Sequence, residues 1–245
     1  MASVKHALFD FFGTLVSYSE SRVEQGYSRS HDLLIANGAR LSYAEFLERW
    51  SATFDEFEAQ AQHSLDEFSM DAVCQEFLAR VLPPSTSATM VLFRDTYLNE
   101  WNRGVAYIPG VPELLSELAK DITLVLVTNT HHPALVQQHL EAMNIAQHFA
   151  LVLTSVEHGK RKPSSCIFER ALAQSGGERD SSIYIGDSFA ADYQGATRAG
   201  LPCLLIDPAH RHDVPDAARL THILDLRTHL TGCDIVSTFS SAANV

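Results

Sequence analysis

Hydrophobic residues follow two different spacings along most of this chain. Six short apolar runs rich in β-branched residues predict buried β-strands, at residues 6–12, 122–128, 150–154, 182–185, 202–206 and 222–226. Between them, apolar residues recur every three or four positions, which predicts helices, at residues 111–119, 134–143, 167–174 and 190–199. Apolar strands that alternate with helices indicate a parallel sheet covered on both faces. The pattern therefore predicts an α/β fold with a Rossmann-like, doubly wound sheet.

The interval 16–107 departs from this pattern. It is rich in Glu and Ser, has helical spacing in three long segments and contains no convincing strand. The three segments are residues 43–57, 70–81 and 85–101. We interpret the interval as a helical insertion after the first strand. The predicted domains are an α/β core of residues 1–15 and 108–231, the insertion of residues 16–107, and a C-terminal tail of residues 232–245.

Composition narrows the classes of partner. With 245 residues, 46% of them hydrophobic, the chain can bury one full core and a smaller domain. Its 30 acidic and 18 basic side chains give a net charge of −12, which argues against nucleic-acid binding because that depends on clustered Lys and Arg. The apolar run near the N-terminus is interrupted by Asp10 and is too short for a signal peptide or a membrane span. We expect a cytoplasmic protein with no membrane partner, either a monomer or a homodimer.

Polar residues that follow the apolar runs are the candidate site, because ligands of open parallel sheets bind beyond the carboxyl ends of the strands. Asp10 ends the first run, and Gly13 and Thr14 come soon after it. Glycine there permits a tight turn close to a ligand. Thr128 and Asn129 end the second run, where a hydroxyl and an amide can hold oxyanions near a helix start.

Two further strand ends carry opposite charges. Lys162 closes a run of three cations just before Pro163, which precedes a predicted helix. After the strand at 182–185 come Asp187 and Asp192, two carboxylates five residues apart on a strand-to-helix turn. Paired acids at a strand tip suit a hard divalent cation.

In this order, the four motifs resemble those of the haloacid-dehalogenase-like (HAD) superfamily, in which an Asp nucleophile is followed by Ser or Thr, then Lys, then an acidic pair. Here these positions are Asp10, Thr128, Lys162, and Asp187 with Asp192. The resemblance covers the whole predicted core. It implies a hydrolase that forms a covalent aspartyl intermediate. It also implies that the insertion is a mobile cap, which closes over the site and excludes water.

The resemblance implies a role for each residue. Asp10 would be the nucleophile, with Lys162 and Thr128 completing the catalytic set. Mg²⁺ and Lys162 would neutralise the charge of the transferred phosphoryl group. The implied metal-binding groups are Asp10, the backbone carbonyl of Phe12 and Asp187, with Asp192 behind them to orient Lys162 or a metal-bound water. The residues expected to bind the substrate are Thr128, Asn129, Lys162, Gly13 and Thr14.

Position 12 departs from the family's pattern. Most phosphatases of this family carry a second Asp there as general acid and base, whereas Phe12 cannot transfer a proton. Such proton transfer is worth about 100- to 10,000-fold in rate. Phe12 is compatible with a phosphatase whose substrate has a good leaving group, or whose acid is a different residue such as His131, His132 or Tyr18.

Phe12 is also compatible with a dehalogenase or with a protein of low activity. Dehalogenases of the 2-haloacid branch look similar in having an aromatic residue at position 12, but they need no metal and typically have Ser in place of Asp187. They also present a cap Arg to the substrate, and the candidates here are Arg22, Arg29, Arg40 and Arg49. A protein of low activity would serve in binding or regulation. Because Asp187 without a cation would repel a carboxylate substrate, we expect a Mg²⁺-dependent phosphatase acting on a small phosphorylated metabolite.

Overall fold

The computed structural model describes residues 4–19, 25–82 and 84–232. The chain divides into two compact units, one formed by the residues up to Ser17 and from Tyr107 onward, the other by Tyr18–Ala106. Arg22 and the predicted tail beyond Gly232 lie outside the described residues. Among the helices that the structure describes, none combines the length and the apolar character needed to cross a membrane.

The first unit contains a six-stranded sheet in which every neighbouring pair is parallel, in the order β5-β4-β1-β6-β7-β8. Its strands are β1 (His6–Phe9), β4 (Thr123–Thr128), β5 (Phe149–Thr154), β6 (Ser182–Gly186), β7 (Cys203–Ile206) and β8 (Arg219–Leu220). Phe9 is in register with Leu126 of β4 and with Ile185 of β6, so the carboxyl ends of these three strands meet at one edge. The predicted α/β fold is confirmed.

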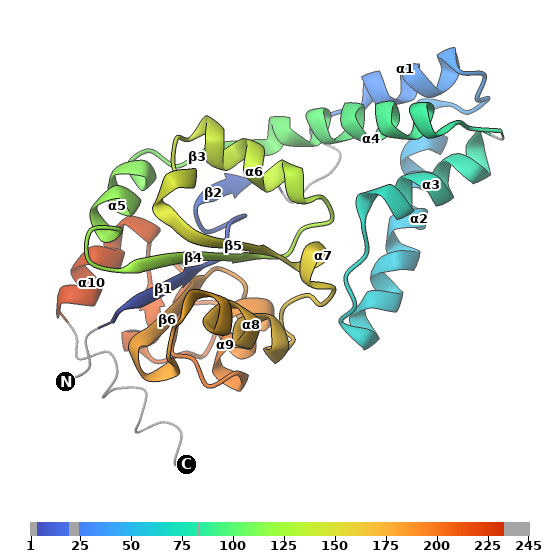
Figure 1. Ribbon diagram of the computed structural model, residues 1–245. Coiled ribbons are helices and arrows are strands. Elements are labelled where there is room, and N and C mark those ends of the chain that lie inside the picture. The colour runs from blue at the N-terminus through green and yellow to red at the C-terminus, as the bar shows by residue number, and fades with distance from the viewer. Residues whose placement is uncertain (1–3, 20–24, 83, 233–245) are drawn as a thin grey trace. The chain divides into compact units, whose positions relative to one another are not determined.

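Helices cover both faces of this sheet, with α6 on one side and α8 and α9 on the other (Figure 1). The helices of the unit are α5 (Val111–Leu118), α6 (Pro133–Ala142), α7 (Ser155–His158), α8 (Ser165–Ser175), α9 (Gln194–Arg198) and α10 (Leu226–Gly232). Its short helical turns are η2 (Ala146–His148), η3 (Arg179–Ser181), η4 (Phe189–Tyr193), η5 (Asp216–Ala218) and η6 (Ile223–Asp225). Because helices cover both faces of the sheet, the side chains on both sides of a strand are buried, as all five residues of β6 are. This explains why the strands appear as continuous apolar runs.

The strand predicted at residues 222–226 is wrong. The sixth strand is β8, which ends at Leu220, and the apolar residues that follow form the short helix η6. His222 begins this turn by accepting a hydrogen bond from the N–H of Leu224, and the Asp225 carboxylate accepts one from the N–H of His222. These reciprocal bonds close a capping box, which competes with an extended backbone.

The second unit is helical. Its helices are α1 (Ser28–Ala36), α2 (Tyr43–Ser64), α3 (Met70–Val81) and α4 (Ser87–Trp101), followed by the turn η1 (Asn102–Gly104). The prediction of no strand in the interval 16–107 is wrong at its ends, where β2 (Val16–Tyr18) and β3 (Val105–Tyr107) form a two-stranded sheet. Each has only three residues, too few for periodicity to reveal.

An acidic residue far away in the sequence caps the first helix of this unit. Helix α1 receives no side-chain bond from its own N-terminal residue Tyr27. The fully buried Glu100 of α4 instead accepts hydrogen bonds from the N–H of Arg29 (2.9 Å) and from the N–H (2.9 Å) and hydroxyl (2.7 Å) of Ser30. The negative charge also lies at the end of the helix where the macrodipole favours it.

Glu100→Ala is expected to lower the free energy of unfolding by about 2–4 kcal/mol, because two buried donors of Ser30 and the partly buried N–H of Arg29 lose a charged acceptor. Urea denaturation followed by tryptophan fluorescence measures this in the helical unit, which holds both tryptophans of the chain, Trp50 and Trp101. Glu48→Ala, an exposed change on α2, is the matched control. Equal midpoints for the two variants would rule out the capping role.

Candidate active site

The candidate site lies where β1, β4 and β6 end. Asp10 follows β1 directly, and its N–H donates a hydrogen bond to the carbonyl of Ile185 (2.9 Å), which ties it to β6. Thr128 is the last residue of β4, and Asp187 comes one residue after β6. Residues far apart in the chain therefore meet at one sheet edge, as expected for parallel strands.

The turn after Asp10 depends on a glycine. Gly13 has a φ of +88°, and a Cβ atom built there would lie 2.1 Å from a carboxylate oxygen of Asp187. Any other residue would meet both backbone strain and a collision. The next residue, Thr14, is buried and its hydroxyl donates to Asp187 (3.3 Å). Gly13 and Thr14 thus shape and hold the Asp187 side of the site.

Lys162 is bound on all sides by the protein. Its ammonium lies 2.8 Å from Asp10, 2.6 Å from Asp192 and 2.8 Å from the hydroxyl of Tyr184, and the residue is only 3% exposed. Asn129 fixes its backbone, because the amide donates to the Lys162 carbonyl (3.0 Å) and accepts from the Lys162 N–H (2.8 Å). Asn129, predicted as a substrate contact, here positions Lys162.

Asp192 is completely buried and its oxygens are already engaged. One oxygen accepts from Lys162 and lies 3.0 Å from the Tyr184 hydroxyl, while the other accepts from the N–H of Ser188 (2.9 Å). Gly186 makes room for this carboxylate, since a Cβ there would lie 2.3 Å from its Cγ atom. These contacts suit a residue that orients Lys162 from behind.

The site carries unbalanced negative charge. Asp10, Asp187 and Asp192 each bring an oxygen within 4.8 Å of the others, and the Lys162 ammonium contacts Asp10 and Asp192. Burial raises the pKa of Asp10, and burial together with Asp10 and Asp192 raises the pKa of Asp187 to about 7. When all three acids are ionised, the one ammonium leaves two negative charges without a partner. A divalent cation with carboxylate and carbonyl ligands fits both this charge and this donor set.

Thr128 offers a hydroxyl at the same edge. It is 1% exposed, and within the described part of the chain its Oγ1 atom has no hydrogen-bond partner. A buried hydroxyl without a partner costs free energy, and this one remains available to bond a ligand.

Phe12 packs into an aromatic cluster. Its ring stands edge-on to Phe11 (5.0 Å between centroids) and to His139 of α6 (6.1 Å). The Nδ1 atom of His139 lies 3.1 Å from the Tyr107 hydroxyl, and burial lowers the pKa of this imidazole. The sequence analysis missed His139, because it occupies an apolar-face position of a predicted helix. The ring contacts explain how an aromatic residue is accommodated at position 12.

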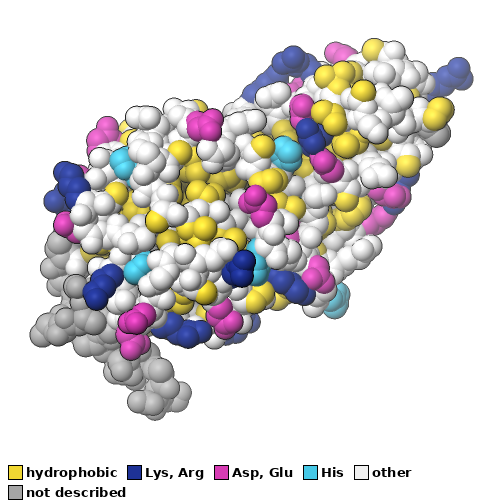
Figure 2. Space-filling model, viewed as in Figure 1, with side chains coloured by type: hydrophobic (Ala, Val, Ile, Leu, Met, Phe, Trp, Pro, Cys, Tyr) yellow, Lys and Arg dark blue, Asp and Glu magenta, His cyan; other side chains and the backbone are white. Residues whose placement is uncertain are grey.

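The other predicted proton donors and cations are spread over both units. His131 and His132 are partly buried in the loop after β4. Tyr18, Arg29, Arg40 and Arg49 are exposed on the helical unit. On the face in Figure 2, basic side chains are interspersed with acidic ones instead of forming a basic patch.

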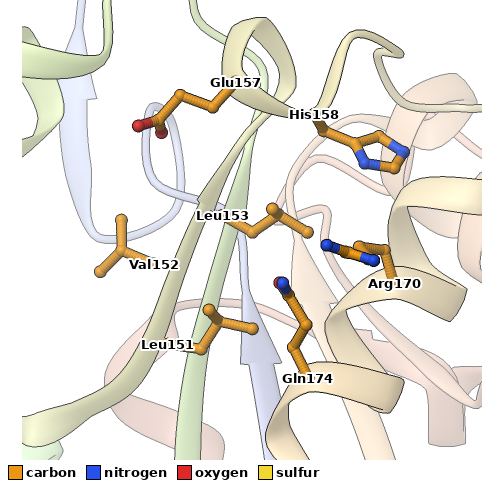
Figure 3. Close-up of a pocket in the computed structure, with 7 residues that line it drawn as sticks. All are labelled: Leu151, Val152, Leu153, Glu157, His158, Arg170 and Gln174. Carbon is orange, nitrogen blue, oxygen red and sulfur yellow. The ribbon is translucent and has the colours of Figure 1, made fainter.

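A pocket of about 540 Å³ lies elsewhere on the first unit, beside the edge strand β5. Figure 3 shows Leu151, Leu153, His158, Arg170 and Gln174 around it. None of the residues predicted for the active site lines this pocket. It is therefore separate from the carboxylate cluster at the ends of β1 and β6.

Known proteins share this sequence pattern and fold. Residues 32–206 match the family model of haloacid dehalogenase-like hydrolases. The ribulose-1,5-bisphosphate 5-phosphatase of Halopiger xanaduensis is 29% identical over 150 residues, which cover 58% of this chain and 62% of that protein. The chain spans about half to three fifths of the length of the first curated relatives that it matches.

Solved structures resemble the chain over nearly its whole length. A 2-haloacid dehalogenase from Pseudomonas syringae pv. Tomato DC3000 superposes with a TM-score of 0.71 at 22% identity, covering 93% of this chain and 98% of that one. A HAD phosphatase from Thermococcus onnurineus gives a TM-score of 0.68 at 20% identity, covering 94% and 99%. At these identities the likeness shows a common fold.

Proposed function

The chain belongs to the haloacid dehalogenase-like hydrolases, and on this premise we propose that it is a Mg²⁺-dependent phosphatase that acts on a small phosphorylated metabolite through Asp10. The observation that carries the proposal is the position of Asp187. Within the described residues, its carboxylate lies beside Asp10 without an ammonium of its own, because Lys162 contacts Asp10 and Asp192. Such a site attracts a divalent cation and repels an anion that arrives without one.

The residues of the chain divide the reaction into two displacements. A carboxylate oxygen of Asp10 forms a bond to phosphorus while the bond from phosphorus to the leaving group breaks, and water later hydrolyses the aspartyl phosphate. Lys162 holds Asp10 in place through its 2.8 Å contact. The unpartnered hydroxyl of Thr128 donates to an oxygen of the phosphoryl group.

Asp10, Asp187 and the backbone carbonyl of Phe12 would hold Mg²⁺, and the bound ion would supply the positive charge that a carboxylate needs to approach a phosphate dianion. The helical unit Tyr18–Ala106 is proposed to act as the cap that excludes water during the reaction.

The side chain at position 12 narrows the proposed substrate. Phe12 has no proton to give to a departing oxygen, and its ring is engaged by Phe11 and His139. A leaving group with a low pKa needs no such proton, so the preferred substrates are phosphate compounds whose leaving group is stable as an anion.

Phe12→Asp is expected to raise the hydrolysis of an alkyl phosphate by about 10- to 100-fold, because a carboxylic acid can then protonate the leaving oxygen. The hydrolysis of an aryl phosphate is expected to gain much less, because its phenolate leaving group departs without protonation. Phe12→Asn is the matched control, since it removes the same ring but carries no acid. Equal alkyl phosphate turnover in the two variants would show that the missing acid does not limit the reaction.

The aromatic residue at position 12 also favours a second candidate, a metal-independent 2-haloacid dehalogenase. Halide departs without protonation, so Phe12 would be no disadvantage in that reaction. Against it stands Asp187, whose negative charge beside Asp10 disfavours a carboxylate substrate when no cation is bound. Phosphatase activity is therefore the stronger proposal.

The deciding experiment compares p-nitrophenyl phosphate and 2-chloropropionate as substrates, each with Mg²⁺ and with EDTA. Phosphate release that requires Mg²⁺ would support the phosphatase. Chloride release that persists in EDTA would establish the dehalogenase. No turnover of either compound would favour a binding or regulatory protein of low activity.

A further inference from the structure

A buried tyrosine that the proposed mechanism does not use touches its central lysine. Tyr184 lies in the middle of β6 and is completely buried. Its hydroxyl accepts a hydrogen bond from the Lys162 ammonium over 2.8 Å. We propose that Tyr184 is a positioning residue, which fixes the Lys162 ammonium against the nucleophile Asp10. The kinetic consequence of this inference rests on the proposed function.

The three protons of the ammonium have three acceptors. An ammonium offers three N–H donors at tetrahedral angles, and those of Lys162 face Asp10 (2.8 Å), Asp192 (2.6 Å) and Tyr184 (2.8 Å). Two acceptors alone would leave one buried donor unsatisfied, which is costly. The phenol oxygen completes the set without adding a fourth negative charge to a site that already has three carboxylates.

The hydroxyl of Tyr184 is itself held in place. It lies 3.0 Å from the backbone carbonyl of Val127 in β4 and 3.0 Å from Asp192, and its single proton can be donated to one of them. Burial, reinforced by the charges of Asp192 and Asp10, raises the pKa of this phenol well above its usual value, so it stays neutral. A neutral, anchored phenol links β6 to β4 and gives the lysine a fixed partner.

The alternative is a purely structural role for the ring. Tyr184 packs edge-on against Phe168, with 5.0 Å between ring centroids, and belongs to a core cluster that includes Leu8 and Val125. Tyr184→Phe separates the two roles, because the ring remains and only the hydroxyl is lost. Tyr193→Phe makes the same chemical change on η4, where the ring stacks on Phe189, and serves as the matched control.

In the first measurement, Tyr184→Phe is expected to lower kcat for p-nitrophenyl phosphate about 10- to 100-fold, the value of a hydrogen bond to a charged group. KM is expected to stay within about twofold, because Tyr184 acts through Lys162 and does not touch the substrate. A purely structural role would lower the thermal midpoint and leave kcat per folded molecule unchanged. Tyr193→Phe is expected to behave like the wild type in both respects.

In the second measurement, the ammonium is observed directly by NMR of protein labelled with ¹⁵N-lysine. The chain has four lysines, and the ζ-ammonium signal of Lys162 is assigned by elimination with Lys5→Arg, Lys120→Arg and Lys160→Arg. Wild-type protein is expected to show slow exchange of its protons with water, because all three are bonded in a buried site. Tyr184→Phe is expected to raise that exchange rate at least about tenfold.

The two measurements separate the inference from the function. If the wild type does not hydrolyse the phosphate at all, the proposed function fails, and the ammonium exchange rate still decides whether Tyr184 positions Lys162. An unchanged exchange rate in Tyr184→Phe would overturn the inference, whatever happens to kcat. Faster exchange with unchanged kcat in an active phosphatase would equally overturn a role in positioning for catalysis.

Discussion

Asp10→Asn is expected to lower phosphate release from p-nitrophenyl phosphate by about 10,000-fold or more, since replacement of a nucleophile commonly removes most of the catalysis. An amide oxygen has almost the shape of a carboxylate oxygen but lacks the charge that attacks phosphorus. Asp10 follows β1 directly, where it lies 2.8 Å from the Lys162 ammonium and within 4.8 Å of an Asp187 carboxylate oxygen. Colorimetric assay with Mg²⁺ in excess measures the change.

Loss of activity in this variant is expected without loss of folding. Burial raises the pKa of Asp10, which means that its charge is held there at a cost, and Asp192 adds to that cost. A neutral amide removes the cost of burying the charge and the repulsion from Asp192. Lys162 keeps its contacts with Asp192 and Tyr184. The thermal midpoint is expected to stay equal or to rise. Asp180→Asn, an exposed change, is the control, and retained turnover in Asp10→Asn would exclude Asp10 as nucleophile.

The sequence predicted the sheet well because burial on both faces leaves a strong local signal. The strands β1, β4 and β6 consist mainly of buried apolar residues, and Asp10, Thr128 and Asp187 stand at their carboxyl ends or within two residues of them. Parallel strands then bring Asp10, Thr128 and Asp187 to one edge without any need to know the side-chain contacts. The part of the site that depends on strand order could therefore be predicted.

Contacts of residues that belong to no recognisable sequence motif could not be predicted. Tyr184 occurs inside an apolar run, and nothing in its neighbours shows that its hydroxyl reaches Lys162. Glu100 is one of two acidic residues in the long helix α4, and unlike the exposed Asp95 it is buried against α1. Both roles join residues far apart in the chain, and hydrophobic periodicity carries no information about such pairs.

The error at residues 222–226 has a local cause. His222 and Asp225 form a capping box across a segment whose apolar residues also suit a strand. Short apolar runs are ambiguous between strand and helix, and side-chain bonds to the backbone decide the outcome.

Lys162→Met is expected to reduce both activity and stability. The change keeps a long unbranched side chain but removes the ammonium, so Asp10 and Asp192 become buried carboxylates without a cation. Breaking a buried pair in this way costs about 3–5 kcal/mol. Turnover is expected to fall by about 1,000-fold, because the proposed nucleophile Asp10 loses the contact that orients it and the site loses a charge that would offset the phosphate. Urea denaturation and the p-nitrophenyl phosphate assay measure the two effects.

Two further variants test whether the stranded carboxylate causes the instability. Lys160→Met removes a cation two residues earlier in the same loop and is expected to leave both the midpoint and the turnover near their wild-type values. Asp192→Asn in the Lys162→Met background neutralises the fully buried acid, and it is expected to recover about half of the lost free energy of unfolding while activity stays low. No recovery would mean that the uncompensated charge of Asp192 is not what destabilises the Lys162→Met variant. Full recovery of stability without activity would separate the two roles, since the fold then requires only charge balance whereas the reaction requires the ammonium itself.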